Sequence, residues 1–285
     1  MVIPYKREDA YIPRIAAIHD LCGYGKCSLG VAIPVLSAAG CDVCPIPTGI
    51  FSSHTAFPGW YMHDTTSILE DYLAAWRKIG VEIDAVYSGF LGDPVQVDVI
   101  REVWETYPAA LRVVDPVMAD HGKVYPTYTD ELVEAMGTLA DGADILTPNL
   151  TEASIILGRE WPGPDVDELT VRTMILELRE RGAKNVVLKG IEHGDGLIHN
   201  YVWGDAVDFT ETTNAKLPYM LHGTGDLFAS ALLAAVMGGR GLAEATEFAA
   251  DFTADAMLIS AKQPHFEDRG VSFEPLLGKV ADLLS

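Results

Sequence analysis

Short apolar runs alternate with longer amphipathic stretches along most of the chain. The short runs are rich in β-branched residues, which predicts buried strands. They are residues 15–18, 43–46, 85–87, 111–114, 145–146, 186–188 and 197–203. The longer stretches carry apolar residues three and four positions apart, as amphipathic helices do, and span residues 65–79, 94–107, 130–139 and 168–181. This alternation predicts an α/β fold, with a mostly parallel sheet covered by helices on both faces.

The last third of the chain has a different pattern. Residues 198–209 resemble a β-hairpin that turns at residues 204–205, and residues 224–237 and 242–261 predict two consecutive buried helices. No repeat, low-complexity tract or long linker divides the sequence. With 285 residues, 49% of them hydrophobic, we expect one large domain over residues 1–285.

The charge balance narrows the class of partner. The chain has 20 Lys and Arg against 41 Asp and Glu, a formal net charge of −21, and no basic block. Such a surface repels polyanions, so we expect no nucleic-acid and no membrane partner. Residues 1–11 are polar and charged, unlike a signal peptide, and no apolar run has the length of a membrane span. These features predict a cytoplasmic protein.

Four cysteines stand at positions 22, 27, 41 and 44. Cys41 and Cys44 form a C-x₂-C pair without a second pair at zinc-site spacing. We therefore expect reduced thiols rather than a metal site or disulfides.

Polar residues follow the predicted strands at the points where the strands end. Ligands of open α/β sheets bind beyond the carboxyl ends of the strands, so these residues are expected to share one rim. The candidates are Asp20, Thr48, His54, Phe90, Asp115, Thr147, Asn149, Glu152 and Lys189.

The most specific motif is Gly223-Thr224-Gly225-Asp226, which runs directly into an apolar helix. Glycines at a helix start let backbone N–H groups converge on an anion, and the helix dipole adds to the attraction. An ordinary N-cap by Thr224 or Asp226 is the alternative interpretation. A cap does not explain a carboxylate beside an anion hole, where it could accept a hydroxyl proton while the amides stabilise a phosphoryl group. This pattern is typical of a kinase.

The chain resembles the pyridoxal and pyridoxamine (vitamin B6) kinases of the ribokinase-like superfamily. The resemblance runs from about residue 15 to about residue 261 and rests on motifs that occur in the expected order. They are Phe51-Ser52-Ser53-His54-Thr55, Asp115-Pro116-Val117-Met118, Thr147-Pro148-Asn149-x-x-Glu152 and the Gly-Thr-Gly-Asp helix start. It implies a three-layer fold, ATP-dependent phosphorylation of a 5′-hydroxymethyl group, and a homodimer.

The resemblance also implies roles for individual residues. Asp226 would deprotonate the substrate, and the amides of Gly223, Thr224 and Gly225 would hold the transferring phosphate. Thr48, Asp20, His54 and Phe90 would form the substrate site, with Phe90 as a stacking wall. Asp115, Thr147, Asn149, Glu152 and Lys189 would arrange the ATP phosphates and the metal, whose hard oxygen ligands suit Mg²⁺ or K⁺. Residues 120–125 would form a flap over the phosphates.

Two positions depart from the vitamin B6 pattern. His19-Asp20-Leu21 replaces the usual Gln-Ser-His, and Lys189 stands where these kinases often have Thr. Both features are closer to the hydroxymethylpyrimidine kinases, whereas Asp226 and the Phe51 to Thr55 motif favour vitamin B6. Hydroxymethylpyrimidine kinase and a non-catalytic nucleotide-binding or vitamin-binding protein therefore stay as alternatives.

Some single residues also have purely structural interpretations. Asp20 fits a turn cap as well as a ligand, His54 fits a structural histidine, and Phe90 fits the core. Lys189 is better explained as a phosphate contact, because a lysine at a strand end is unusual in so acidic a chain.

Overall fold

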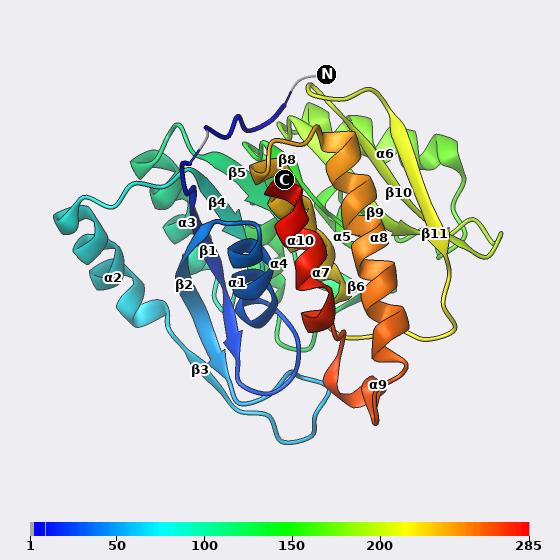
Figure 1. The fold of residues 1–285 in the computed structure, drawn as a ribbon, viewed down its shortest axis with the longest axis horizontal. Helices are drawn as coiled ribbons and strands as arrows, with labels where there is room; N and C mark the ends of the chain where they lie inside the picture. The colour runs from blue at the N-terminus through cyan, green and yellow to red at the C-terminus, as the bar shows by residue number, and fades with distance from the viewer. Residues whose placement is uncertain (1–2, 9, 285) are drawn as a thin grey trace.

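The computed structural model describes residues 3–8 and 10–284, and a long sheet forms its centre. The strands are β1 (Arg14–Cys22), β2 (Asp42–Phe51), β3 (Met62–Asp64), β4 (Ala85–Ser88), β5 (Leu111–Val114), β8 (Ile145–Leu146), β9 (Asn185–Ile191), β10 (Leu197–Gly204) and β11 (Thr210–Ala215). Within the described residues they make a nine-stranded sheet in the order β11-β10-β9-β8-β5-β4-β1-β2-β3 (Figure 1). The strands from β2 to β9 in this order are parallel, and β3 and β10 run antiparallel to their inner neighbours.

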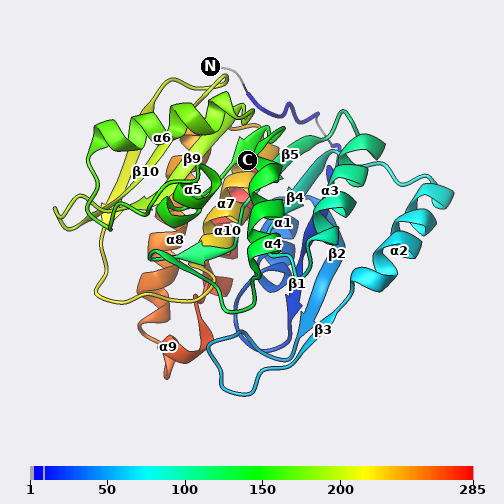
Figure 2. The same cartoon turned by 180° about the vertical axis from the view of Figure 1, so that it is seen from behind.

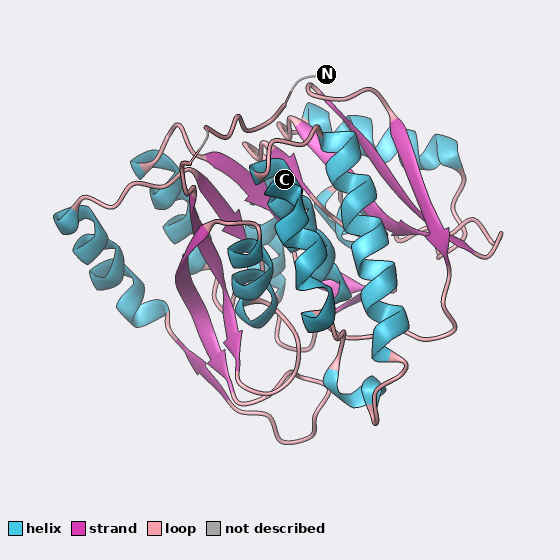
Figure 3. Cartoon of the chain, in the orientation of Figure 1, coloured by secondary structure: helices cyan, strands magenta, loops and turns pink. Residues whose placement is uncertain are grey.

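Helices cover both faces of the sheet. The face seen in Figure 1 carries α1 (Leu29–Ala38), α7 (Thr224–Met237), α8 (Leu242–Ser260) and α10 (Leu277–Ala281). Figure 2 shows the other face, with α2 (Thr66–Ile79), α3 (Val95–Thr106), α4 (Asp130–Gly137), α5 (Leu150–Ile156) and α6 (Glu168–Glu180). The short α9 (Phe266–Arg269) lies beyond α8. Two hydrophobic cores fill the space between sheet and helices, so the fold has three layers (Figure 3).

The predicted fold class is confirmed, because the central strands are buried on both faces, as parallel strands must be. The predicted helices occur with ends that differ by no more than a few residues. No helix among residues 3–8 and 10–284 is long and apolar enough to cross a membrane.

The predicted hairpin at residues 198–209 was wrong in its second strand. β11 begins at Thr210, and its Thr210 pairs with Val202, so residues 205–209 form the connection. The turn is longer than the sequence suggested because Phe209 packs against the core beside Tyr201 instead of continuing the ladder.

Several short elements lay outside the predicted pattern. α1 is apolar along nearly its whole length and contains Pro34, so it has no amphipathic period. α5 is a short helix held by its cap, and β3 is a short edge strand. β6 (Ala119–Asp120) and β7 (Lys123–Val124) form a separate small hairpin in the segment expected to be a flap.

Candidate active site

The N-terminus of α7 is open toward the carboxyl edge of the sheet. Gly223 is the N-cap with a φ of 82°, and no side chain caps the helix in the part of the chain described. A Cβ atom on Gly223 would lie 1.9 Å from the carbonyl oxygen of Lys26, so this position requires glycine. The Thr224 hydroxyl donates to the carbonyl of Leu221 at 3.1 Å. Neither Thr224 nor Asp226 acts as the cap, which leaves the first N–H groups available to an anion.

Lys189 brings a positive charge to this helix start. A Cβ atom on Gly225 would lie 3.8 Å from Cε and 4.0 Å from Nζ of Lys189. The ammonium donates to Asp115 and, at 2.6 Å, to the carbonyl of Thr147. Burial lowers the pKa of Lys189, but the carboxylates of Asp115 and Glu152 outweigh this and raise it. Lys189 is therefore held charged beside the helix N-terminus.

Asp115, Thr147 and Lys189 meet because β5, β8 and β9 are neighbours in the sheet. The Thr147 hydroxyl donates to Oδ1 of Asp115 at 2.9 Å. Oδ2 of Asp115 is buried and has no hydrogen-bond partner among the described residues. An unpartnered, fully buried carboxylate oxygen is a donor that suits a hard cation such as Mg²⁺.

Asp226 is a buried carboxylate in the first turn of α7. Its Oδ1 has no partner within the ranges that the structure describes. Burial raises its pKa to about 7, Asp115 and Asp20 add to the rise, and the backbone N–H of Ser28 and the charge of Lys189 oppose it. A carboxylate with a pKa near neutrality is matched to accepting a proton from a hydroxyl group.

Asn149 and Glu152 form a capping box at the start of α5. The Asn149 side chain accepts from the N–H of Glu152 at 2.9 Å, and Oε2 of Glu152 accepts from the N–H of Asn149 at 2.8 Å. Oε1 of Glu152 accepts from the N–H of Met118 at 3.2 Å. Burial raises the pKa of Glu152 to about 8. Since backbone amides occupy both oxygens, this arrangement would let Glu152 meet a metal through bridging water.

Two of the predicted substrate residues lie at a small apolar cluster of Cys22, Phe51 and Phe90, namely Phe90 itself and Thr48. The Phe90 ring is edge-on to Phe51, with centroids 5.5 Å apart, and only 8% exposed. The Thr48 hydroxyl donates to the carbonyl of Phe90 at 2.8 Å, so it holds the segment that follows β4. All three side chains of this cluster are buried, and the two rings are nearly perpendicular, so an aromatic ligand would meet the edge of an apolar cluster.

Asp20 stands at an irregularity in β1. The pairing of β1 with β2 shifts register between His19 and Leu21, and a bulge of this kind re-aims a side chain. Burial raises the pKa of Asp20 to about 6, and the Ser28 hydroxyl partly opposes this. The charge of Asp20 also contributes to the raised pKa of Asp226, so the two carboxyl groups interact electrostatically.

His54 has structural partners, whereas both ring nitrogens of His19 are buried without a hydrogen-bond partner among the described residues. Nε2 of His54 donates to the carbonyl of Asp268 at 2.9 Å, and its ring stacks on His222 at 4.5 Å. His54 therefore ties the loop after β2 to the segment that precedes Gly223. His19 is edge-on to Tyr87, and burial lowers its pKa to about 3, so its ring is neutral.

Ser28 is a further candidate site residue that lies outside the sequence motifs. It precedes α1 with a φ of 50°, an unusual value for a residue other than glycine. Its hydroxyl stabilises the charge of Asp20 and its N–H that of Asp226, so it links both acids. A serine before an apolar run is a helix-start signal that could have identified it.

Comparison with known proteins identifies the family of this chain. The phosphomethylpyrimidine kinase family model matches residues 35–268. Pyridoxal kinase PdxY of Pseudomonas aeruginosa is 28% identical over 252 residues, which cover 83% of this chain and 85% of that protein.

Two solved structures have the same fold along almost their whole length. A Bacteroides thetaiotaomicron protein described as a phosphomethylpyrimidine kinase and crystallised with pyridoxal superposes with a TM-score of 0.90 and 31% identity, covering 95% of this chain and 96% of that one. Pyridoxal kinase from Lactobacillus plantarum superposes with a TM-score of 0.88 and 26% sequence identity, covering 96% of this chain and 98% of that one. The resemblance to the vitamin B6 kinases is confirmed. The chain therefore belongs to the phosphomethylpyrimidine kinase family and is a kinase of ribokinase-like fold.

Proposed function

We propose that this protein transfers the γ-phosphoryl group of ATP to the 5′-hydroxymethyl group of pyridoxal, pyridoxine or pyridoxamine. The observation that carries the proposal is Asp226, a buried carboxylate with an unpartnered oxygen at the open N-terminus of α7. The relatives named pyridoxal kinase, and the related Bacteroides protein crystallised with pyridoxal, support vitamin B6 as the substrate class.

In the proposed reaction, the substrate oxygen forms a bond to the γ-phosphorus while the bond from that phosphorus to the β-phosphate oxygen breaks. Asp226 accepts the hydroxyl proton, and ADP leaves with the bridging oxygen. The N–H groups at Thr224 and Gly225, with Lys189 beside them, stabilise the charge on the phosphoryl oxygens. These groups are already in place before the substrate arrives, which lowers the cost of reorganisation.

Asp115, Thr147 and Glu152 are the oxygen donors that would hold Mg²⁺, with K⁺ as an accompanying ion. Mg²⁺ supplies neutralisation of the phosphate charge when it is bound. Oδ2 of Asp115 is the donor best suited to a direct bond, because it is buried and unpartnered. The positive charge of Lys189 offsets the negative charge of Asp115, which would reduce the repulsion between this carboxylate and a bound polyphosphate.

The pyridine ring is proposed to lie against Phe90 and Phe51, with Asp20 facing its polar edge and Thr48 and His54 shaping the surrounding loops. A carboxylate at Asp20 can accept a hydrogen bond from a protonated ring nitrogen, a phenol or an amine. Its position at the bulge of β1 and its electrostatic interaction with Asp226 support this role.

Hydroxymethylpyrimidine is the second candidate substrate. Asp20 acts electrostatically on Asp226 and Lys189 lies beside Gly225, and these two residues depart from the vitamin B6 pattern. An ionised acceptor at Asp20 would recognise the amino group of a pyrimidine as well as a vitamin B6 ring.

We extend the proposal to a single kinase domain over residues 1–285 that acts in the cytoplasm as a homodimer. The described cysteines are free, as a reducing compartment requires. Two layers of helices share one sheet, which supports a single domain.

The test is ATP-dependent phosphate transfer to pyridoxal, pyridoxine, pyridoxamine and hydroxymethylpyrimidine, measured side by side with Mg²⁺. We expect kcat/KM to be highest for a vitamin B6 compound. A higher value for hydroxymethylpyrimidine would favour the second candidate, and no transfer to any of the four would refute the proposed substrate class.

A further inference from the structure

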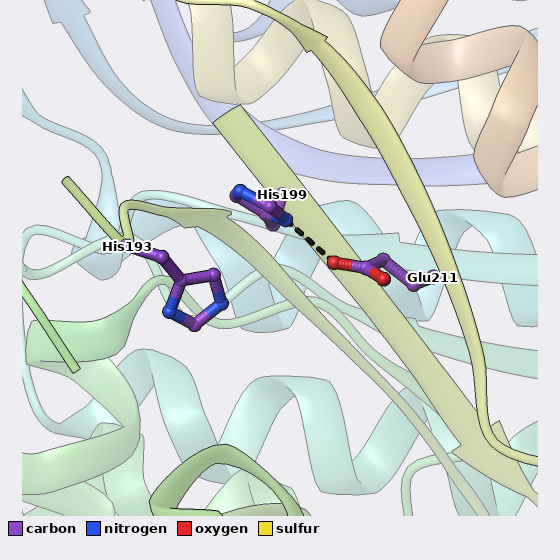
Figure 4. A group of neighbouring side chains, drawn as sticks. All are labelled: His193, His199 and Glu211. Carbon is purple, nitrogen blue, oxygen red and sulfur yellow. Dashed lines mark hydrogen bonds and ion pairs between the residues drawn. The ribbon is translucent and has the colours of Figure 1, made fainter. Parts of the chain in front are cut away.

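A cluster of metal-ligating side chains lies away from the candidate active site, at the edge of the sheet formed by β9, β10 and β11. His193 follows β9, His199 is in β10 and Glu211 is in β11 (Figure 4). Tyr201 lies two residues after His199, and its ring is nearly parallel to that of His199. Tyr201 packs in the core on the α6 side of the sheet, whereas Val202 packs on the α7 side, so the cluster and α7 are on opposite faces.

In each of the two histidines, the ring nitrogen that does not face Tyr201 or Glu211 already contacts a hydrogen-bond acceptor. Nδ1 of His193 donates to the backbone carbonyl of Val166. Nε2 of His199 faces the carboxylate of Asp195, at 3.1 and 3.3 Å from its two oxygens. A carbonyl and an ionised carboxylate can only accept, so these nitrogens carry the protons. The lone pair of His193 is then on Nε2. Without a metal, Nδ1 of His199 faces the Glu211 carboxylate and also carries a proton, so the His199 ring forms ion pairs with Asp195 and Glu211, and a bound cation would have to displace that proton.

Nε2 of His193 and Nδ1 of His199 converge on one point with two oxygens. Nδ1 of His199 lies 2.5 Å from Oε1 of Glu211, and Nε2 of His193 lies 2.7 Å from the Tyr201 hydroxyl. That hydroxyl is also 2.8 Å from Oε1 of Glu211. The single proton of the Tyr201 hydroxyl can be donated to only one of these two atoms, Nε2 of His193 or Oε1 of Glu211. One ligand atom from each of His193, His199 and Glu211 lies within 4.8 Å of the others, so a cation between them can reach all three after small side-chain adjustments.

We propose that His193, His199 and Glu211 bind a divalent transition metal of the zinc class, with the Tyr201 hydroxyl or water in the fourth position. Two imidazoles and one carboxylate form a ligand set that Zn²⁺ accepts and that Mg²⁺, which prefers oxygen, does not. The Val166 carbonyl and the Asp195 carboxylate supply the outer hydrogen bonds that orient metal-bound histidines. Such second contacts distinguish this cluster from a chance group of surface histidines.

The metal would join three segments that are separate in the sequence. It would tie the loop after β9 to both strands of the edge hairpin, and Lys189 of the candidate active site lies in that same β9 strand. The inference does not depend on the kinase substrate, because none of its ligands belongs to that site.

The experiment is equilibrium dialysis of the full chain, stripped with a chelator, against ZnCl₂ in the presence of excess MgCl₂ and a phosphine reductant. Bound zinc per chain and the melting temperature with and without zinc are measured, and Co²⁺ absorption reports the ligand geometry. We expect one zinc per chain. His193→Ala and Glu211→Gln should weaken binding by more than about 100-fold, and Asp195→Asn by about 10–100-fold.

His63→Ala is the matched control, because His63 is an exposed histidine on β3 at the opposite edge of the sheet. It should leave zinc affinity unchanged. If His193→Ala does not fold, Glu211→Gln decides, since glutamine keeps the size of the side chain and an acceptor for Tyr201. Absence of stoichiometric zinc binding, or equal affinity in the parent and in Glu211→Gln, would overturn the proposal and place any bound zinc elsewhere.

Discussion

Replacing Asp226 by asparagine should remove activity and, at the same time, stabilise the fold at alkaline pH. The amide would keep the shape of the side chain but could not accept the substrate proton. Turnover should therefore fall by about 10²–10⁴-fold, the usual contribution of a positioned general base. Since the pKa of Asp226 is raised to about 7, kcat/KM of the parent should rise as the pH passes through about 7.

The stability effect follows from the same raised pKa. A folded-state pKa above the ordinary value means that the folded protein holds the proton more tightly than the unfolded chain does. The favourable contribution is complete at low pH and is lost as the pH rises through about 7. The rise from 3.8 to about 7 corresponds to about 4 kcal/mol, at about 1.4 kcal/mol per pKa unit. Between pH 5 and pH 8 the loss is about 3 kcal/mol, because the unfolded carboxyl is already ionised at pH 5.

The assay is urea unfolding of the parent and of Asp226→Asn at pH 5 and pH 8. The difference in unfolding free energy between the two proteins should grow by about 3 kcal/mol in favour of the variant as the pH rises. Taking the difference between two pH values cancels the pH-independent cost of burying an amide. Asp71→Asn, an exposed position on α2, is the control and should show no such growth. A constant difference across the pH range would refute the raised pKa, and near-parent turnover would remove Asp226 from the mechanism.

Four further substitutions test other parts of the site. Gly223→Ala should lower both turnover and melting temperature, because its Cβ would meet the carbonyl of Lys26 at 1.9 Å; an unchanged melting temperature would contradict this. Lys189→Met should raise the KM for ATP by about 10-fold or more, the loss of one charge-assisted contact, and an unchanged KM in steady-state assays would exclude a phosphate contact. Glu152→Gln should raise the Mg²⁺ requirement and the KM for ATP together, which a Mg²⁺ titration checks; an identical titration curve argues against a metal role. Asp20→Ser should change the ratios of kcat/KM among the three vitamin B6 compounds by about 1–3 kcal/mol, whereas an equal fall for all three would make Asp20 a structural cap.

Local sequence determined which residues stand at the carboxyl edge of the sheet. Asp115, Thr147 and Lys189 each follow or end an apolar run, and the direction of a parallel strand sends its last residues to that edge whatever its neighbours are. The Gly-Thr-Gly-Asp start of α7 was likewise readable, because glycine conformation and helix initiation depend on a few adjacent residues.

Sequence patterns did not reveal which groups touch at that edge. Lys189 pairs with Asp115 because β8 lies between β5 and β9. The Glu152 oxygens accept from backbone amides because one closes the capping box of α5 and the other meets the N–H of Met118. The helix-start signal marks Ser28 only as a residue before α1, and its contacts with Asp20 and Asp226 depend on tertiary structure.

The zinc-type cluster depends even more on tertiary structure. His199 and Tyr201 are close in sequence, but Glu211 reaches them only through the register that pairs Tyr201 with Glu211 across β10 and β11. The sequence pattern placed the second strand of this hairpin too early, which would have separated these side chains. Strand order and register are set by how apolar faces are buried across the whole sheet, and a shift of one residue turns every side chain to the other face. Composition and local pattern therefore determined the fold class and the chemistry available, while long-range pairing decided which of those groups meet.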